Sequence, residues 1–181
     1  MEPINPAVWF PVVTLVAGAL LKAAFDYLNE ARQEARERRV RLEKRQETFL
    51  MQRIEAQRVL LPQLQESIVE LMRATNLLHL EDLKNSRETG AWGKALVGDE
   101  ISDRSLASFR QVGLYRVRIH DDELRDDIAK LCSLCSSAIY AKSEYEADEI
   151  MVSAGLFFSE VNERLGEVFR TLDAQEQAML K

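Results

Sequence analysis

The segment from Asp26 to Leu61 contains no glycine and no proline over its 36 residues. These two residues disfavour a helix interior more than any others, so their absence favours one continuous helix. At ~1.5 Å per residue such a helix would reach about 54 Å. The whole chain of 181 residues has only seven glycines and four prolines. The composition therefore predicts an all-α protein and excludes collagen, a disordered chain and most small barrels.

A stretch of nineteen residues without a charge, from Pro3 to Leu21, precedes this helix. A bilayer is crossed by about 20 predominantly apolar residues, so the stretch predicts a transmembrane anchor over residues 1–25. A buried or interfacial helix and a cleaved signal peptide are the alternatives. A signal peptide needs a basic region ahead of its apolar stretch, whereas the only charged side chain in that place is that of Glu2.

Basic residues gather on one side of the predicted anchor, and none precedes it. The eight nearest are Lys22, Arg32, Arg36, Arg38, Arg39, Arg41, Lys44 and Arg45. Because Lys and Arg resist translocation, we expect the N-terminus outside the plasma (inner) membrane and the body in the cytoplasm. Four of these residues are candidates for contact with anionic lipid: Lys22, Arg32, Arg36 and Arg39. The alternative is a solvated face with i,i+4 pairs such as that of Glu34 with Arg38.

Residues 26–61 are assigned to a juxtamembrane helix with a thin apolar stripe at heptad-like spacing. The stripe consists of Leu28, Ala31, Ala35, Leu42 and Phe49. Arg38 and Arg45 occupy stripe positions at which a tight coiled coil would have aliphatic side chains. We therefore expect a charged stalk rather than a zipper.

Small residues recur at four-residue spacing within the predicted anchor. They are Thr14 with Gly18, and Ala19 with Ala23. Such spacing lets two membrane helices approach closely, which favours self-association through this face. Small residues are common in membrane helices, so an anchor without such contacts is the alternative.

Residues 62–181 are expected to form a cytoplasmic antiparallel helical bundle. Apolar residues at helical spacing continue past Pro62: Leu60, Leu61, Leu64, Ile68, Leu71 and Leu78. The proline either kinks the first helix or begins a second one. A loop is predicted over residues 88–103, which hold three of the seven glycines.

Three helical segments are expected after this loop, over residues 102–119, over residues 121–142 and after Ser143. Ser143 and Glu146 form a capping-box pattern at the start of the last one. An apolar series follows it: Ile150, Ala154, Phe157, Val161, Leu165, Val168 and Leu172. Residues 115–119 alternate as in a strand, but nothing else in the chain offers a partner strand, so we expect a helix there as well.

The sequence contains no pattern typical of a catalytic, cofactor or metal site. Cys132 and Cys135 form a single C-x-x-C within a helix, and a zinc site would need two further ligands at a suitable spacing, so we expect buried thiols. Neither His79 nor His120 has the Glu three residues before it that a di-iron helical bundle would supply. We therefore expect both histidines at helix caps or on the surface. The net charge of -6 disfavours a dedicated nucleic-acid binder. We expect no cofactor and no enzymatic activity.

Trp92 lies between Gly90 and Gly93 in the predicted loop. We expect its large ring to pack the loop onto the bundle. Its alternative role is that of an anchor for a protein partner, since tryptophan is enriched among the residues that dominate interfaces.

Two parts of the chain carry a resemblance to a known group. One is the Pro-Val-Val-Thr-Leu-Val stretch at residues 11–16, which runs into Leu20 and Leu21. The other is the string Arg-Glu-Thr-Gly-Ala-Trp-Gly at residues 87–93. With the Arg/Glu-rich helix between them, the chain resembles a group of small uncharacterised bacterial single-pass membrane-anchored helical proteins. The resemblance implies a bacterial plasma-membrane location and no particular activity.

Together these patterns predict a membrane-tethered, non-enzymatic interaction module. It would act as an adaptor or scaffold that holds an unknown protein partner near the lipid bilayer. The alternative is a self-associating membrane protein, a homo-oligomer or a pore-like stress or defence effector. Nucleic acid is not expected among its partners.

Overall fold

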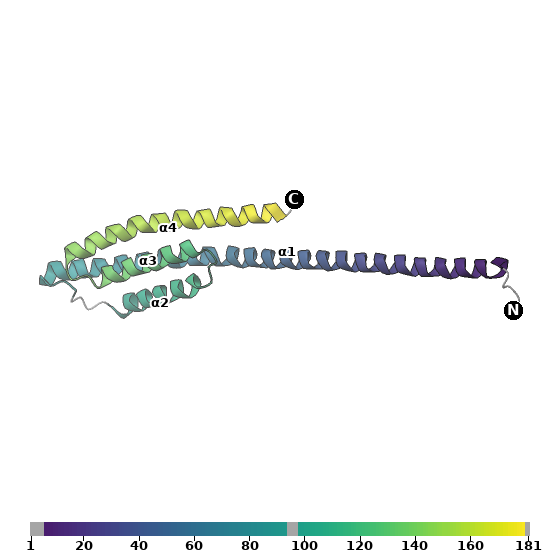
Figure 1. Ribbon diagram of the computed structural model, residues 1–181. Helices are drawn as coiled ribbons and strands as arrows, with labels where there is room; N and C mark the ends of the chain where they lie inside the picture. Colours follow the sequence, from purple (N-terminus) through teal and green to yellow (C-terminus); the bar gives the residue numbers. More distant parts are fainter. Residues whose placement is uncertain (1–5, 94–97, 180–181) are drawn as a thin grey trace. The chain divides into compact units, whose positions relative to one another are not determined.

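The computed structural model describes residues 6–93 and 98–179, with only the backbone of residues 6–13, 17, 24 and 31. These residues form four α-helices: α1 Pro6–Thr89, α2 Asp99–Arg116, α3 Asp122–Ile139 and α4 Glu144–Met179 (Figure 1). Neither described range contains a strand, which confirms the all-α class.

The chain divides into two compact units, residues 1–50 and residues 51–181. The second unit therefore includes residues 51–61, which the sequence pattern attributes to the stalk. Four side chains in this stretch are buried: Ile54, Gln57, Leu60 and Leu61. Their burial explains why the stretch belongs with the bundle.

Within the second unit, the C-terminal part of α1 and the three later helices run in alternating directions, as an up-down-up-down bundle (Figure 1). All four contribute to one core. Its fully buried side chains include Leu61, Leu64, Ile68 and Leu71 of α1, Val112 of α2, Leu124, Ile128 and Leu131 of α3, and Val161 and Leu165 of α4. Burying one such side chain contributes roughly 1.5–3 kcal/mol, so this shared core holds the helices together.

The first helix does not restart at Pro62, because α1 continues through it to Thr89. Pro62 is exposed. A proline has no N–H to donate to the carbonyl one turn earlier, that of Arg58, and on an exposed side water can bind such a carbonyl. The buried series therefore runs from Ile54 to Leu78 on a single helix.

Side chains cap the starts of α3 and α4. Asp121 Oδ1 accepts the backbone N–H of Leu124 at 2.8 Å and so caps α3. Ser143 Oγ accepts the N–H of Glu146 at 3.2 Å. This bond confirms the Ser143 half of the predicted capping box, whereas the Glu146 carboxylate accepts the N–H of Lys142, at 2.9 Å, instead of that of Ser143.

Two connections differ from the expected ones. α1 extends to Thr89 and α2 begins at Asp99, so the loop expected over residues 88–103 is confined to residues 90–98, of which 94–97 lie outside the described residues. Gly90 and Gly93 have positive φ angles of 71° and 67°, which side chains with a Cβ rarely adopt. α2 ends at Arg116, so residues 117–119 form a turn rather than the end of the expected helix.

In the first unit, every described side chain of α1 is exposed. The apolar ones include Leu15, Val16, Leu20, Leu21, Phe25, Leu28, Leu42 and Phe49. Among the residues that the structure describes, no helix combines the length and the apolar composition needed to cross a bilayer. The predicted span from Pro3 to Leu21 falls partly outside that description, which omits residues 1–5 and the side chains of residues 6–13 and 17.

Candidate functional site

An exposed apolar stripe on α4 is the clearest candidate for a contact surface on the bundle. It consists of Tyr145, Val152 and Leu156, which are 79%, 65% and 68% exposed. Their spacing of seven and four residues places them on one face of the helix. The buried residues Ala154 and Val161 lie on the opposite face. We call these three exposed side chains the α4 stripe.

Carboxylates border the α4 stripe. Glu149 and Glu160 are exposed and lie one helical turn from Val152 and Leu156. They belong to a strongly acidic part of the chain, since residues 120–181 hold fourteen acidic and six basic residues. The helical spacing of these three apolar residues is visible in the sequence. It is easily overlooked, because the opposite face of the same helix carries a longer apolar series.

The ring of Trp92 packs against the bundle. Its indole Nε1–H donates to the carbonyl oxygen of Ala141 at 2.9 Å. Its ring centroid lies 5.9 Å from that of His79. The side chain of Asn85 also holds the loop, because its Nδ2 donates to the carbonyl of Ala91 at 3.1 Å. These contacts agree with the packing role expected for Trp92, and its role as a partner anchor stays a prediction.

His79 is packed beside Trp92, so the surface or cap position expected for it is wrong. Its side chain is 10% exposed, and its Nε2 lies 2.9 Å from Oδ1 of Asp148. Its Nδ1 is buried without a hydrogen-bond partner. The sequence could not reveal this contact, since Asp148 lies three helices further along the chain.

A buried amide joins α1 to the turn between α2 and α3. Gln57 is only 4% exposed. Its Nε2 donates to the carbonyl of Arg118 at 3.0 Å, and its Oε1 accepts the backbone N–H of His120 at 3.1 Å. Both ends of the amide are therefore satisfied, as buried polar groups require. The only sequence signal for this role is the place of Gln57 in the buried series, midway between Ile54 and Leu60.

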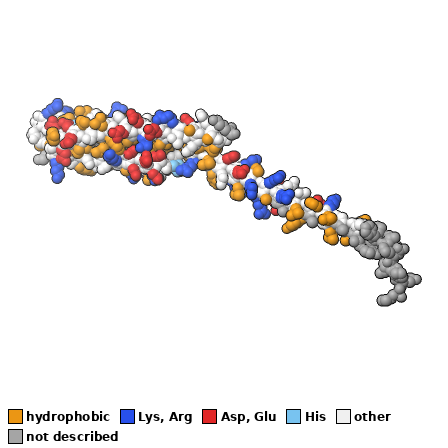
Figure 2. All heavy atoms as spheres, turned by 45° about the horizontal axis from the view of Figure 1, so that its top comes forward, with side chains coloured by type: hydrophobic (Ala, Val, Ile, Leu, Met, Phe, Trp, Pro, Cys, Tyr) orange, Lys and Arg blue, Asp and Glu red, His pale blue; other side chains and the backbone are white. Residues whose placement is uncertain are grey.

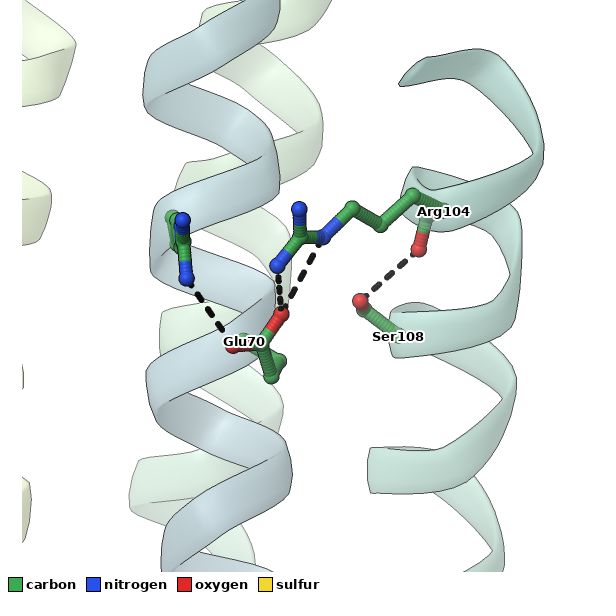
Figure 3. Close-up of polar contacts among 4 residues, drawn as sticks. Glu70, Arg104 and Ser108 are labelled. Carbon is green, nitrogen blue, oxygen red and sulfur yellow. Dashed lines mark hydrogen bonds and ion pairs between the residues drawn. The ribbon is translucent and has the colours of Figure 1, made fainter. Parts of the chain in front are cut away.

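Ion pairs link α1 to the neighbouring helices at the edge of the core. Glu70 accepts two hydrogen bonds from Arg104 of α2, at 3.1 Å from Nε and at 2.6 Å from Nη2 (Figure 3). These bonds hold the pKa of the Glu70 carboxyl below its ordinary value. Arg58 contacts Asp173 and Glu176 of α4, at 2.6 Å each.

Both cysteines are free thiols within α3. Burial raises the pKa of Cys132, and it raises the pKa of Cys135 to about 11. Because the thiolate is the reactive form, neither environment favours redox chemistry. Cys135 Sγ lies 3.5 Å from Met72 Sδ, a contact typical of a thiol packed as a small apolar side chain.

Acidic residues at the start of α3 contact arginines. Arg164 of α4 lies 2.8 Å from Glu123 and 3.8 Å from Asp127, and Arg125 pairs with Asp122. Within the described ranges, no three His, Cys, Asp or Glu side chains are grouped so that they could hold a metal ion.

The residues predicted to contact the membrane or a second copy lie in the first unit. Those proposed for helix association are exposed: Thr14, Gly18, Ala19 and Ala23. A Cβ added at Gly18 would have no atom of the chain within 4 Å, so the single chain tolerates a larger side chain there. The four basic candidates are exposed as well: Lys22, Arg32, Arg36 and Arg39.

No protein-family model, no curated protein and no solved structure matches the chain. Its own surfaces and side-chain contacts therefore carry the functional argument.

Proposed function

We propose that the protein is a membrane-tethered, non-enzymatic adaptor whose bundle offers the α4 stripe to an amphipathic helix of a partner protein. The observation that carries this proposal is the α4 stripe itself. Three large apolar side chains are exposed on a helix whose opposite face is occupied by the core. Exposed apolar side chains that share one face of a helix, with polar residues around them, are typical of interaction surfaces. Apolar anchors at helical spacing on a partner would complement such a stripe.

The charges around the stripe define the chemistry of the partner. Glu149 and Glu160 border its apolar side chains. Basic residues beside the apolar face of the partner helix would complement these carboxylates, which would speed encounter and disfavour acidic competitors. The adaptor would therefore select a basic amphipathic helix.

The membrane tether rests on the first unit. The uncharged stretch from Pro3 to Leu21 has the length of a bilayer span. Its described apolar side chains, among them Leu15 and Leu20, are 73% and 67% exposed, and hydrocarbon would cover them. The basic residues after the stretch favour an external N-terminus and a cytoplasmic body at the plasma (inner) membrane. A reducing cytoplasm also suits the free thiols of the bundle.

Photo-crosslinking in the native membrane tests the partner surface. A photoreactive amino acid replaces Val152 in the full chain, and we expect one adduct with a foreign protein. Leu156→Glu should abolish this adduct because it places a charge in the contact. Leu106→Glu is the matched control, since Leu106 on α2 is 66% exposed, close to the 68% of Leu156. The control should leave the adduct unchanged.

Five results would contradict the proposal. An adduct that survives Leu156→Glu, or the absence of any adduct, would remove the α4 stripe as the contact surface. An adduct between two copies of the chain would replace the adaptor with the self-associating alternative. Release of the chain by an alkaline wash, or digestion of the body by protease added outside intact cells, would overturn the tether or its orientation.

A further inference from the structure

The charged side chains of α1 between Phe25 and Leu42 are sorted onto two faces of the helix. One face carries residues that each lie three or four positions from a neighbour in the set: Phe25, Leu28, Arg32, Arg36, Arg39 and Leu42. The other face carries every carboxylate of this segment: Asp26, Glu30, Glu34 and Glu37. We call the first set the basic-apolar face. It ends at Leu42 because Glu43 follows on the same side.

Ion pairs distinguish the two faces. Arg38 and Arg41 lie 3.6 Å from Glu34 and Glu37, one turn earlier on the helix. In the part of the chain that the structure describes, no ion pair involves the three arginines of the basic-apolar face. Three guanidinium groups therefore stand without a carboxylate, beside exposed apolar side chains.

Those apolar side chains are large. Phe25, Leu28 and Leu42 are 63%, 51% and 59% exposed. Figure 2 shows apolar and basic side chains next to one another along this unit. A surface that covers this face must accept apolar groups and three positive charges together.

We propose that the basic-apolar face lies on the surface of an anionic lipid bilayer. The apolar side chains would enter the boundary between headgroups and acyl chains, as in other basic amphipathic helices. The guanidinium groups would bind lipid phosphates, which supply the missing negative charge. The face begins at Phe25, four residues after the uncharged stretch ends, so a bilayer that holds this stretch would lie close to it. With that stretch in the bilayer, residues 25–42 can lie along the membrane, over about 26 Å, only if α1 bends between Leu21 and Phe25, since it is one continuous helix in the structure.

The position of the arginines favours lipid over a protein partner. Arg32 and Arg39 stand in line with Leu28 and Leu42, in the middle of the face. A protein that covered the leucines would also bury these guanidinium groups, at a large desolvation cost unless each found a paired carboxylate. At a bilayer surface, the long arginine side chains can reach the headgroups while their stems stay on apolar groups.

A dye at position 42 of the full chain tests this inference. The chain carries Leu42→Cys with an environment-sensitive dye, together with Cys132→Ser and Cys135→Ser. It is incorporated into phosphatidylcholine vesicles with or without phosphatidylglycerol, and flotation and dye emission are measured. We expect a blue shift of the emission only when the anionic lipid is present, and we expect high salt to reduce it.

Two triple variants, each of which removes three positive charges, test whether the blue shift depends on the basic-apolar face or only on the net charge. Arg32→Gln, Arg36→Gln and Arg39→Gln should abolish the shift, because three fewer basic contacts move the binding equilibrium on the order of 100-fold. The control is Arg38→Gln, Arg41→Gln and Lys44→Gln, which removes three positive charges from outside the basic-apolar face. The control should keep the shift.

The inference rests in part on the proposed tether, and the measurements separate the two. Flotation with both kinds of vesicle but no blue shift would overturn the inference and leave the tether. Flotation and a blue shift with anionic vesicles alone would support the inference and overturn the tether. No flotation with either vesicle would overturn both. A blue shift that occurs in native membranes and not in anionic vesicles would show that a protein covers the basic-apolar face. It would overturn the proposal that lipid covers it.

Discussion

α1 passes through both units of the chain, and the same residue type meets different surroundings in each. In the second unit, Leu61 and Leu64 are fully buried among the other helices. In the first unit, Leu28 and Leu42 are 51% and 59% exposed. Both stretches are helical, so helix formation does not distinguish them. The difference shows that the bundle is stabilised by shared burial, whereas the first unit offers apolar groups that some other surface can cover.

Arginines differ between the units in the same way. In the bundle, Arg58 and Arg104 contact carboxylates of other helices. In the first unit, Arg38 and Arg41 contact carboxylates one turn away on α1 itself. Pairs within one helix turn support the helix but do not position it against anything else.

The largest effect is expected from a cavity in the core. Leu64→Ala should lower the free energy of unfolding by about 2–5 kcal/mol, because it leaves a void among well-packed side chains. Urea unfolding followed by circular dichroism measures this loss. Leu80→Ala is the control on the same helix, since Leu80 is 50% exposed. Equal losses in the two variants would contradict the shared core.

The next largest effect is expected in thiol reactivity, which should differ between a cysteine of the second unit and one placed in the first unit. The pKa of the Cys135 thiol is raised from 9.0 to about 11 by burial. Its thiolate fraction near neutral pH is therefore lower by about 100-fold than that of an exposed cysteine, such as one introduced as Leu42→Cys. Alkylation at a series of pH values, followed by mass spectrometry, should show the rate at Cys135 still rising near pH 11. A plateau near pH 9 would contradict the burial effect.

The same shift predicts how stability depends on pH. A raised pKa means that the folded chain holds the Cys135 proton more tightly than the unfolded chain does. The contribution of this group is therefore complete below pH 9.0 and is lost as the pH rises toward about 11. Thermal unfolding over this range should show stability falling for the native chain more than for Cys135→Ala.

Removal of the buried amide should have an intermediate effect. Gln57→Ala leaves the carbonyl of Arg118 and the N–H of His120 without their partner. We expect a loss of roughly 1–3 kcal/mol in the free energy of unfolding, measured in urea. Gln65→Ala is a matched control, because Gln65 is an exposed glutamine of α1 that also bonds another helix, at Asn162. A loss as large for Gln65 as for Gln57 would contradict the role of burial.

The smallest effect is expected in the first unit. Leu42→Ala should change the free energy of unfolding by less than about 0.5 kcal/mol, as is usual for exposed positions. The urea measurement used for Leu64→Ala checks it. A loss that approaches that of Leu64→Ala would mean that Leu42 is covered in solution, and would direct attention to a second copy of the chain.

Local signals in the sequence predict much of this fold. The scarcity of glycine and proline indicates helices, and the buried series in α4 follows the predicted spacing. The capping residue Ser143 acts as expected, because a cap depends on neighbours within one turn. The continuation of α1 through Pro62 is harder to foresee, since it depends on which side of the helix faces solvent.

Contacts between distant segments could not be predicted from one sequence. The packing of His79 against Trp92 and Asp148 requires the ends of several helices to meet. The contacts of Arg58 with α4 and of Arg104 with α1 likewise join different helices. Such contacts depend on how the helices align, and hydrophobic periodicity determines only which face of each helix is buried.

Gln57 has a consequence for that alignment. If α1 slid along the bundle by one turn, Arg53 or Leu61 would stand opposite the turn between α2 and α3. Arginine has no acceptor and leucine has neither donor nor acceptor, so neither could serve both the Arg118 carbonyl and the His120 N–H. The leucine-rich series alone would tolerate such a slip, because it repeats. A single polar side chain thus selects one register of α1 among several of similar apolar burial, as a lone asparagine does in a coiled coil.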